Sequence, residues 1–222
     1  MEAMAATSTG STADAGPAAG GAKEALREAF ERRLEPGRAL ADEAEPIVRA
    51  CHAMAVRFHR GGRLIVFGNG GACADAQHVA VEFVHPVIVG KRALPALALT
   101  GDVATLTGIA AADGVEEMFA APLRALAEPG DIALGLSPDG RCVNVRRGLE
   151  TARAMGLLTI ALTGHGDGGG LARDGVVDHL LTARSSDPLV VKELHVTVYH
   201  VLWELVHVFL ERPGLLETGE VG

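Results

Sequence analysis

The sequence of 222 residues is poor in aromatic side chains and contains no long run of basic residues. Phe, Trp and Tyr together make up 4% of the chain, so its core must be built mainly from Ala, Val and Leu. The formal net charge is −8, whereas proteins that bind nucleic acids use clustered Lys and Arg to neutralise phosphates. We therefore expect no nucleic-acid partner.

Cysteines are also few, and neither a membrane span nor a signal peptide is recognisable. Cys51, Cys73 and Cys142 are far apart and odd in number, which favours free thiols in a reducing compartment over a disulfide framework. No apolar run approaches the roughly 20 residues of a membrane-spanning helix. Glu2 stands where a signal peptide has positive charge, and no apolar segment follows it. These features predict a cytoplasmic protein without membrane contact.

The composition divides the chain into one domain and two short tails. Residues 1–22 are dominated by Ala, Gly, Ser and Thr, which offer little to bury, so we expect this segment to be disordered. Residues 23–212 are long enough for a single domain with a full core. Residues 213–222 are expected to form a short C-terminal tail.

Short apolar strands alternate with helices from residue 63 onward. The predicted strands cover residues 63–68, 94–101, 131–137, 157–164 and 176–183. The predicted helices cover residues 22–34, 45–60, 72–84, 142–156 and 188–211, with helical stretches across 102–127 and a short helix near Leu171. Such alternation implies right-handed crossovers and a parallel sheet that helices cover on both faces. The expected fold class is α/β, a three-layer α/β/α sandwich around a five-stranded parallel sheet, with N-terminal helices and a long C-terminal helix.

Turn-forming segments follow three of the predicted strands, at residues 68–71, 137–140 and 164–170. In open parallel sheets, ligands bind beyond the carboxyl ends of the strands. We therefore expect these three segments to converge on one crevice.

The first of these segments, Gly68-Asn69-Gly70-Gly71, joins a strand to a helix. Glycines allow the backbone to approach a ligand closely, and the helix N-terminus offers unpaired N–H groups and a positive dipole end. We interpret the segment as an anion-binding turn. The alternative is a tight turn that binds nothing.

His78 and Glu82 are four residues apart in the helix expected at 72–84, so their side chains share one face. Asp75 lies on the same face, one turn earlier. Imidazole and carboxylate groups beside an anion-binding turn are suited to proton transfer or to metal binding. The alternative is a solvated polar stripe with a hydrogen bond between His78 and Glu82.

The closing helix at 188–211 carries a second polar stripe within an otherwise apolar sequence. If that helix is buried, its polar groups need partners, which makes the stripe a candidate site. We favour a functional role for His200 over His195 and His207, and the alternative is the polar face of an exposed helix. The stripe consists of Glu193, Thr197, His200, Glu204 and His207.

Five segments together carry a resemblance to a known family. They are GNGGACADAQHVAVEF at 68–83, ALTGD at 98–102, EPGDIALGLS at 128–137, MGLLTIALTG at 155–164 and KELHVTVYHVLWELV at 192–206. In these segments and their spacing, residues 22–211 resemble the sugar isomerase (SIS) family, in particular its phosphoheptose isomerase branch.

The resemblance implies a fold, an assembly and a reaction. The fold would be the SIS fold, a five-stranded parallel sheet between helices, and the assembly would be a homotetramer with active sites at subunit contacts. The reaction would be an aldose–ketose isomerisation of a phosphorylated sugar through an enediol, as in the conversion of sedoheptulose 7-phosphate. Glu82 matches the family's catalytic base and His200 matches its catalytic acid.

Zinc-containing members of the family bind the metal through residues that match His78, Glu82 and His200, and through a glutamine that Lys192 replaces here. A protonated lysine cannot bind zinc and would repel it. The resemblance therefore implies zinc as a cofactor, whereas Lys192 argues against it. We hypothesise that Lys192 instead stabilises the enediolate as a fixed charge.

The substrate-binding residues depart from the family pattern. A family loop of sequence Ser-Thr-Ser-Gly-Asn-Ser grips phosphate with hydroxyl groups, and only Ser137 and Gly140 of that loop remain here. Pro138 removes an N–H donor, Asp139 adds a negative charge, and Arg141 supplies a cation. The residues expected to bind substrate are Gly68, Asn69, Gly70, Gly71, Ser137, Asp139, Gly140, Arg141 and Lys192.

Three functions compete on these residues. The leading hypothesis is an isomerase that acts on a phosphorylated sugar with altered substrate contacts. The second is a non-catalytic SIS protein that binds a sugar phosphate, or a pseudo-subunit that forms a hetero-oligomer with another SIS chain. The third is a protein-interaction role, like that of SIS proteins that associate with the bacterial replication initiator. Glu82 argues against the third, because those proteins usually lack this glutamate.

Overall fold

The computed structural model describes residues 17–42, 44–165, 168–173, 175–212 and 214–217. By its contacts the chain divides into two units, Met1–Glu35 and Pro36–Gly222. The division expected from composition, with one domain between two tails, stays a prediction.

Helix α1 (Pro17–Asp42) crosses the boundary between the two units. Residues 17–22, which were expected to be disordered, belong to this helix, and residues 1–16 lie outside the described residues. The helix also continues past residue 34, where the sequence predicted its end, and includes Pro36. Proline lacks the N–H that would bond to the carbonyl four residues earlier. The boundary between the units falls at this weak point of the helix.

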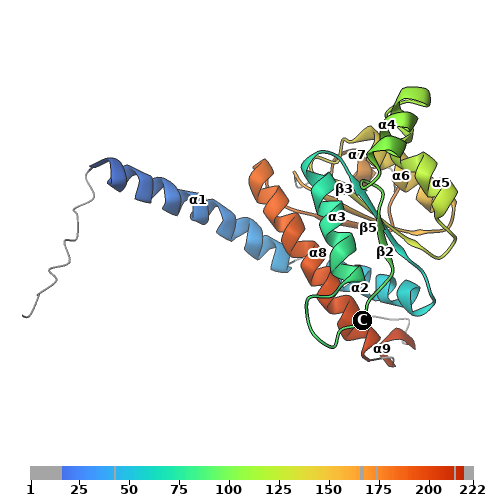
Figure 1. Ribbon diagram of the computed structural model, residues 1–222. Coiled ribbons are helices and arrows are strands. Elements are labelled where there is room, and N and C mark those ends of the chain that lie inside the picture. Colours follow the sequence, from blue (N-terminus) through green and yellow to red (C-terminus); the bar gives the residue numbers. More distant parts are fainter. Residues whose placement is uncertain (1–16, 43, 166–167, 174, 213, 218–222) are drawn as a thin grey trace, which may run out of the picture. The chain divides into compact units, whose positions relative to one another are not determined.

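The unit from Pro36 onward alternates helices and strands in the predicted order (Figure 1). Its strands are β1 (Leu64–Gly68), β2 (Ala96–Ala98), β3 (Ile132–Ser137), β4 (Leu158–Thr163) and β5 (His179–Thr182). Its helices after α1 are α2 (Ala44–His59), α3 (Gly71–Val84), α4 (Val103–Ala112), α5 (Glu117–Leu126), α6 (Val143–Ala154), α7 (Gly169–Arg173), α8 (Pro188–Leu210) and α9 (Gly214–Glu217). Among the described residues, no helix has the length and the apolar run needed to cross a bilayer.

The strands form one five-stranded parallel sheet in the order β2-β1-β3-β4-β5, which confirms the expected α/β fold. β1 pairs with both β2 and β3, so the chain leaves β1 toward one side of the sheet and then returns on the other. Such a reversal is a switch point, where α/β folds bind ligands beyond the carboxyl ends of the strands. The turns that follow β1 and β3 are therefore neighbours.

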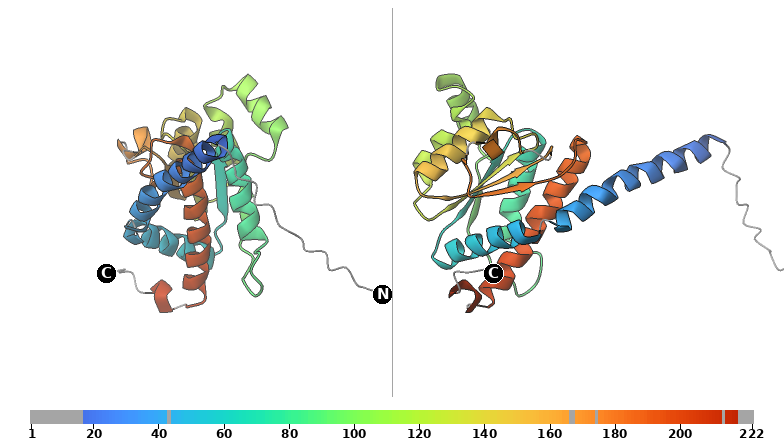
Figure 2. Two further views of the ribbon diagram at one scale, coloured as in Figure 1. Left: turned by 90° about the vertical axis from the view of Figure 1, so that its left-hand side faces the viewer. Right: turned by 180° about the vertical axis from the view of Figure 1, so that it is seen from behind.

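Successive residues of each strand face opposite layers of helices (Figure 1 and Figure 2). Leu64 and Val66 pack in the layer with α2, α3 and α8, whereas Ile65 and Phe67 pack in the layer with α4 to α7. Every residue of the three central strands is buried. Burial on both faces explains why these strands have continuous apolar sequences instead of an alternating pattern.

The two edge strands are shorter than predicted. β2 covers 96–98 of the expected 94–101, and β5 covers 179–182 of the expected 176–183. Each edge strand pairs on one side only, so its ladder ends as soon as the chain turns away from that neighbour. Part of the predicted C-terminal tail is helical, since α9 lies within it.

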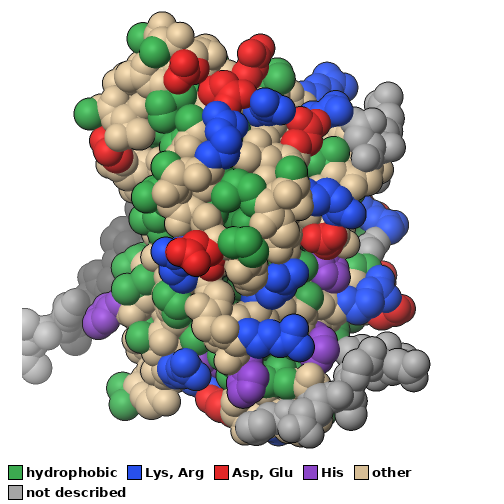
Figure 3. All heavy atoms as spheres, turned by 90° about the vertical axis from the view of Figure 1, so that its right-hand side faces the viewer, with side chains coloured by type: hydrophobic (Ala, Val, Ile, Leu, Met, Phe, Trp, Pro, Cys, Tyr) green, Lys and Arg blue, Asp and Glu red, His purple; other side chains and the backbone are tan. Residues whose placement is uncertain are grey.

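The face shown in Figure 3 carries charges of both signs. On the face shown in Figure 3, Lys and Arg side chains alternate with Asp and Glu side chains and with small apolar areas. Interspersed charges of this kind are typical of a solvated surface.

Candidate active site

The turn that follows β1 depends on glycine at two positions. Gly70 has a φ of 55°, a conformation that favours glycine, and it precedes the first residue of α3. A Cβ atom at Gly68 would lie 2.9 Å from both the Ala72 side chain and the Leu136 carbonyl, so no larger residue fits there. The two glycines thus produce a tight turn that places the first turn of α3 at the carboxyl edge of the sheet.

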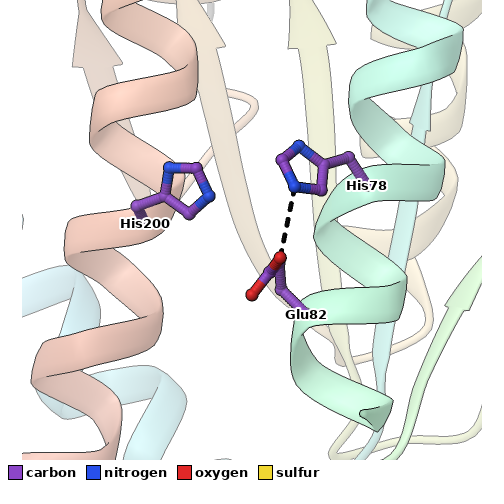
Figure 4. A group of neighbouring side chains, drawn as sticks. All are labelled: His78, Glu82 and His200. Atoms are coloured by element: carbon purple, nitrogen blue, oxygen red, sulfur yellow. Dashed lines mark hydrogen bonds and ion pairs between the residues drawn. The ribbon is translucent and has the colours of Figure 1, made fainter. Parts of the chain in front are cut away.

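His78 and Glu82 project from α3 toward His200 on the neighbouring helix α8 (Figure 4). Nε2 of His78 lies 3.2 Å from Oε1 of Glu82. One ligand atom from each of the three residues lies within 4.8 Å of the other two. The Glu82 side chain is 14% exposed, whereas His200 is open to solvent. The structure therefore brings together the three residues that the sequence singled out for acid–base chemistry and metal binding.

Two aromatic side chains of α8 hold this cluster in place, and neither was expected from the sequence. The hydroxyl of Tyr199 lies 2.7 Å from Nδ1 of His78, and Nε1–H of Trp203 donates to the backbone carbonyl of Glu82 at 2.9 Å. Both aromatic residues are buried. The sequence offered one indication of their importance, because the chain contains a single tyrosine and a single tryptophan.

Lys192 takes part in an ion pair beside the cluster. Its Nζ donates to the two carboxylate oxygens of Asp75, at 2.6 and 2.7 Å, and to the carbonyl of Gly71 at 3.2 Å. These three acceptors match the three protons of an ammonium group. Asp75 is buried, so the pair ties α8 to the start of α3. This structural role was not expected from the sequence, and the role of Lys192 toward an enediolate stays a hypothesis.

The segment after β3 forms a tight loop whose polar groups bond within the loop. The amide of Cys142 donates to Oγ of Ser137 at 3.3 Å, and the amide of Gly140 donates to the Ser137 carbonyl at 2.9 Å. The amide of Arg141 donates to Oδ1 of Asp139 at 3.0 Å. One oxygen of the Asp139 carboxylate is therefore held by its own loop, while the Arg141 side chain is exposed.

The three turn-forming strand ends are linked through neighbouring residues, whereas a crevice between them stays a prediction. Asn69 and Asn144 exchange two side-chain hydrogen bonds, of 2.7 and 2.9 Å, which join the turn after β1 to the first turn of α6. Gly140 has a φ of 67°, and a Cβ atom there would overlap the Gly168 carbonyl. The loops after β3 and β4 are therefore packed backbone against backbone.

A family model described as the SIS domain matches residues 28–164 of the chain. The chain belongs to the SIS domain family. Among its curated relatives is a phosphoheptose isomerase from Desulfovibrio desulfuricans. The two are 40% identical over 172 residues, which cover 77% of this chain and 80% of that protein.

Solved structures of two phosphoheptose isomerases resemble this SIS chain. The protein from Neisseria gonorrhoeae is 30% identical, with a TM-score of 0.75, and the match covers 83% of this chain and 97% of that one. The protein from Francisella tularensis is 29% identical, with a TM-score of 0.78, and the match covers 84% and 98%. The SIS chain is thus similar to phosphoheptose isomerases in sequence and in fold over most of its length.

The other two histidines of α8, His195 and His207, lie within hydrogen-bond distance of backbone carbonyls. Nε2 of the buried His195 lies 3.0 Å from the Thr163 carbonyl, and burial lowers the pKa of His195, which favours the neutral ring. The ring nitrogens of His207 lie 2.8 Å from the Trp203 carbonyl and 2.9 Å from the Arg92 carbonyl. The exposed members of the predicted polar stripe are Glu193, Thr197, His200 and Glu204.

The donor set of this SIS chain fits a zinc ion. Two imidazoles and a carboxylate are common zinc ligands, and catalytic zinc sites often use three protein ligands and leave one position open. The 3.2 Å between His78 and Glu82 suits two neighbouring ligands that each lie about 2.0–2.2 Å from one ion. Lys192 directs its ammonium to Asp75 and offers no fourth ligand.

We expect Lys192→Met to lower the free energy of unfolding by about 1–3 kcal/mol, because it leaves the buried carboxylate of Asp75 unpaired. The cost stays below that of a fully buried pair, since 45% of the Lys192 side chain is exposed. Urea unfolding measures the difference. The matched control is Lys91→Met, which removes the partner of the exposed Glu211 and should cost clearly less than Lys192→Met. Equal losses in the two variants would contradict the structural role of the Lys192 pair.

Proposed function

We propose that this SIS chain is an aldose–ketose isomerase that acts on a phosphorylated sugar through an enediol, with sedoheptulose 7-phosphate as the first substrate to test. The observation that carries the proposal is that Glu82 and His200 project toward each other from the facing helices α3 and α8 (Figure 4). Similarity to proteins named phosphoheptose isomerase supports both the reaction and the substrate class. The altered loop at 137–142 favours the alternative, a non-catalytic protein that binds a sugar phosphate.

The reaction moves one proton between adjacent carbons and another between their oxygens. From aldose to ketose, the Glu82 carboxylate removes the proton on C2 while His200 gives a proton to the carbonyl oxygen on C1, which forms the enediol. His200 then takes the proton of the hydroxyl on C2, and Glu82 returns its proton to C1. The product has a carbonyl at C2 and a hydroxyl at C1. Proton transfer by a positioned side chain contributes about 10²–10⁴-fold to a rate.

We also propose that His78, Glu82 and His200 hold a zinc ion, which when bound would polarise the substrate carbonyl and stabilise negative charge on its oxygen. A carboxylate has two oxygens, so Glu82 can offer one to a metal and one to the carbon-bound proton. A protonated imidazole has no lone pair for a metal, so His200 acts as the acid in the metal-free chain and as a ligand in the zinc-loaded chain. The donor set and its spacing support this assignment.

We further propose that the substrate phosphate binds between the turn after β1 and the loop after β3. Residues 68–71 supply backbone N–H groups, and Arg141 supplies a cation that can bond phosphate through two donors. Asp139 opposes this binding. Two unit charges about 4 Å apart interact by about 4 kcal/mol at the effective dielectric of a protein surface. Repulsion by Asp139 and attraction by Arg141 are therefore of similar size, and their distances from the phosphate decide the balance.

We expect Glu82→Gln to lower turnover by at least about 100-fold, because an amide does not accept the carbon-bound proton. The measurement is NMR of sedoheptulose 7-phosphate incubated with the protein in D₂O, which detects conversion and also exchange of the carbon-bound proton. The matched control is Glu204→Gln, an exposed glutamate one turn from His200 on α8, which should retain wild-type turnover.

Full turnover by Glu82→Gln would contradict the assignment of the base. A wild-type protein that binds the sugar phosphate but neither converts it nor exchanges its protons would support the non-catalytic alternative.

Asp139→Ser is expected to lower the KM for the phosphorylated sugar by about 3- to 10-fold, because it removes a negative charge from the phosphate site and keeps an acceptor for the Arg141 amide. Arg141→Gln should raise the KM by a similar factor. Asp113→Ser, at the exposed end of α4, is the control and should change nothing. If neither Asp139→Ser nor Arg141→Gln alters the KM, the phosphate binds elsewhere.

We propose that the chain assembles as a homo-oligomer, and its resemblance to the family suggests a homotetramer. The alternative is a hetero-oligomer with another SIS chain. In α1, Leu26, Phe30 and Leu34 recur on one face and are 58%, 63% and 54% exposed. The unit from Pro36 onward has an apolar groove of about 250 Å³. Residues that line this groove include Leu40, Ile47, Val198, Val201 and Leu205. Exposed apolar surfaces of this kind mark subunit contacts.

Replacing Leu26, Phe30 and Leu34 by serine should reduce the mass of the assembly seen in sedimentation equilibrium, because the apolar face of α1 is lost. A triple serine variant of Glu24, Glu28 and Glu31, also exposed on α1, is the control and should keep the wild-type mass. A wild-type chain that is monomeric alone and assembles only with a second SIS chain would support the hetero-oligomer.

We propose a cytoplasmic location. All three cysteines of the chain are free thiols, as expected in a reducing compartment. Burial raises the pKa of Cys51 to about 12, which keeps this thiol protonated and unreactive.

A further inference from the structure

Tyr199, the single tyrosine of the chain, packs against both histidines of the site. Its ring centroid lies 5.4 Å from that of His78 and 4.9 Å from that of His200. The residue is 1% exposed, and its hydroxyl lies 2.7 Å from Nδ1 of His78. The ordinary pKa of a tyrosine hydroxyl is about 10, so the hydroxyl carries its proton near neutral pH. A neutral hydroxyl can either donate or accept a hydrogen bond.

The second ring nitrogen of His78 decides the direction of the bond to Tyr199. Nε2 of His78 lies 3.2 Å from Oε1 of Glu82. A carboxylate can only accept, so the hydrogen-bond network assigns the proton of a neutral His78 ring to Nε2. Nδ1 then has a free lone pair, and the Tyr199 hydroxyl donates to it.

A divalent cation held by His78 and Glu82 requires the opposite arrangement. The cation needs the lone pair of Nε2, so the ring proton must lie on Nδ1. Nδ1 then donates, and its partner must accept. A hydroxyl reverses its role by rotating its O–H bond, without moving any heavy atom, whereas a carbonyl can only accept and an ammonium can only donate.

Two histidines of α8, His195 and His207, have carbonyl partners instead of a hydroxyl. Nε2 of His195 faces the Thr163 carbonyl, and both ring nitrogens of His207 face backbone carbonyls. A carbonyl requires a proton on the nitrogen that faces it, so these nitrogens are not available as ligands. The hydroxyl partner therefore sets His78 apart from His195 and His207.

We propose that Tyr199 is the positioning residue of this site. Its hydroxyl accepts the Nδ1 proton of His78 and so directs Nε2 toward a divalent cation, and it donates to Nδ1 when Nε2 is instead bonded to Glu82. This proposal rests on the proposed function and adds to it a residue outside the ligand set. Loss of the partner that orients a metal-bound histidine typically weakens metal binding by about 10- to 100-fold.

The test is the affinity of the full chain for Zn²⁺ without sugar, measured by competition with a chelator. Tyr199→Phe keeps the ring and removes the hydroxyl, and it should weaken Zn²⁺ binding by about 10- to 100-fold. The control is Thr107→Val, which removes an exposed hydroxyl that bonds within α4 and should leave the affinity unchanged. Circular dichroism and the melting temperature establish that the variants are folded.

A second measurement uses the wild-type chain and depends on no variant. Protein labelled with ¹³C at tyrosine Cζ gives one signal, because the chain has one tyrosine, and its chemical shift depends on whether the hydroxyl donates or accepts. Zn²⁺ should move this signal. Trp203, the single tryptophan, donates its indole N–H to the Glu82 carbonyl, so its fluorescence reports independently that Zn²⁺ has bound at the site.

Wild-type Zn²⁺ affinity in a folded Tyr199→Phe protein would overturn the proposal. A Cζ signal that stays unchanged while Trp203 fluorescence responds would also overturn it, as would a wild-type chain that binds no Zn²⁺. Sugar conversion is assayed separately. A chain that isomerises the sugar but binds Zn²⁺ equally well without the hydroxyl contradicts only the role of Tyr199, whereas a chain that binds Zn²⁺ as proposed but converts no sugar contradicts only the proposed function.

Discussion

The packing of α3 against α8 is the contact on which the candidate site depends. The two helices lie in one apolar layer against the sheet, where Val79 of α3 and Val198 of α8 are buried. A helix that buries one face leaves its neighbouring faces in a set direction, because successive side chains are rotated by a constant angle. His78 and Glu82 therefore face His200 across the helix pair. Apolar packing, more than polar attraction, determines where the acid–base groups lie.

Polar contacts then restrict how α8 can slide along α3. Near the start of α3, Asp75 pairs with Lys192. Near the end of α3, the carbonyl of Glu82 accepts a hydrogen bond from the indole of Trp203. Between these two contacts, His78 bonds to Tyr199. Among the described residues, every buried side-chain nitrogen or oxygen atom has a hydrogen-bond partner. A shift of one residue between the helices would break all three contacts and leave buried polar groups unpaired, which is costly in an apolar layer.

The acid–base cluster and the proposed phosphate site are built on different elements. The cluster belongs to α3 and α8, whereas the loop that replaces the family's hydroxyl-rich segment follows β3. Because the loop bonds mainly within itself, its sequence can change without moving the cluster. This separation explains how a chain can keep Glu82 and His200 while its loop sequence departs from the family pattern. We therefore expect the loops, and not the shared SIS fold, to determine which ligand the chain selects.

Local patterns were sufficient to predict the alternation of strands and helices, the glycine turn after β1, and the shared face of His78 and Glu82, because periodicity and glycine conformation are properties of short segments. Local patterns did not predict the lengths of the edge strands or the continuation of α1 through Pro36. At these places the surrounding structure overrides the preferences of the local sequence. Resemblance to a family added the hypothesis that His200 is the catalytic acid. The bond between Tyr199 and His78 joins residues 121 positions apart, and the one between Lys192 and Asp75 spans 117. Such contacts depend on how two helices pack, which only the tertiary structure decides.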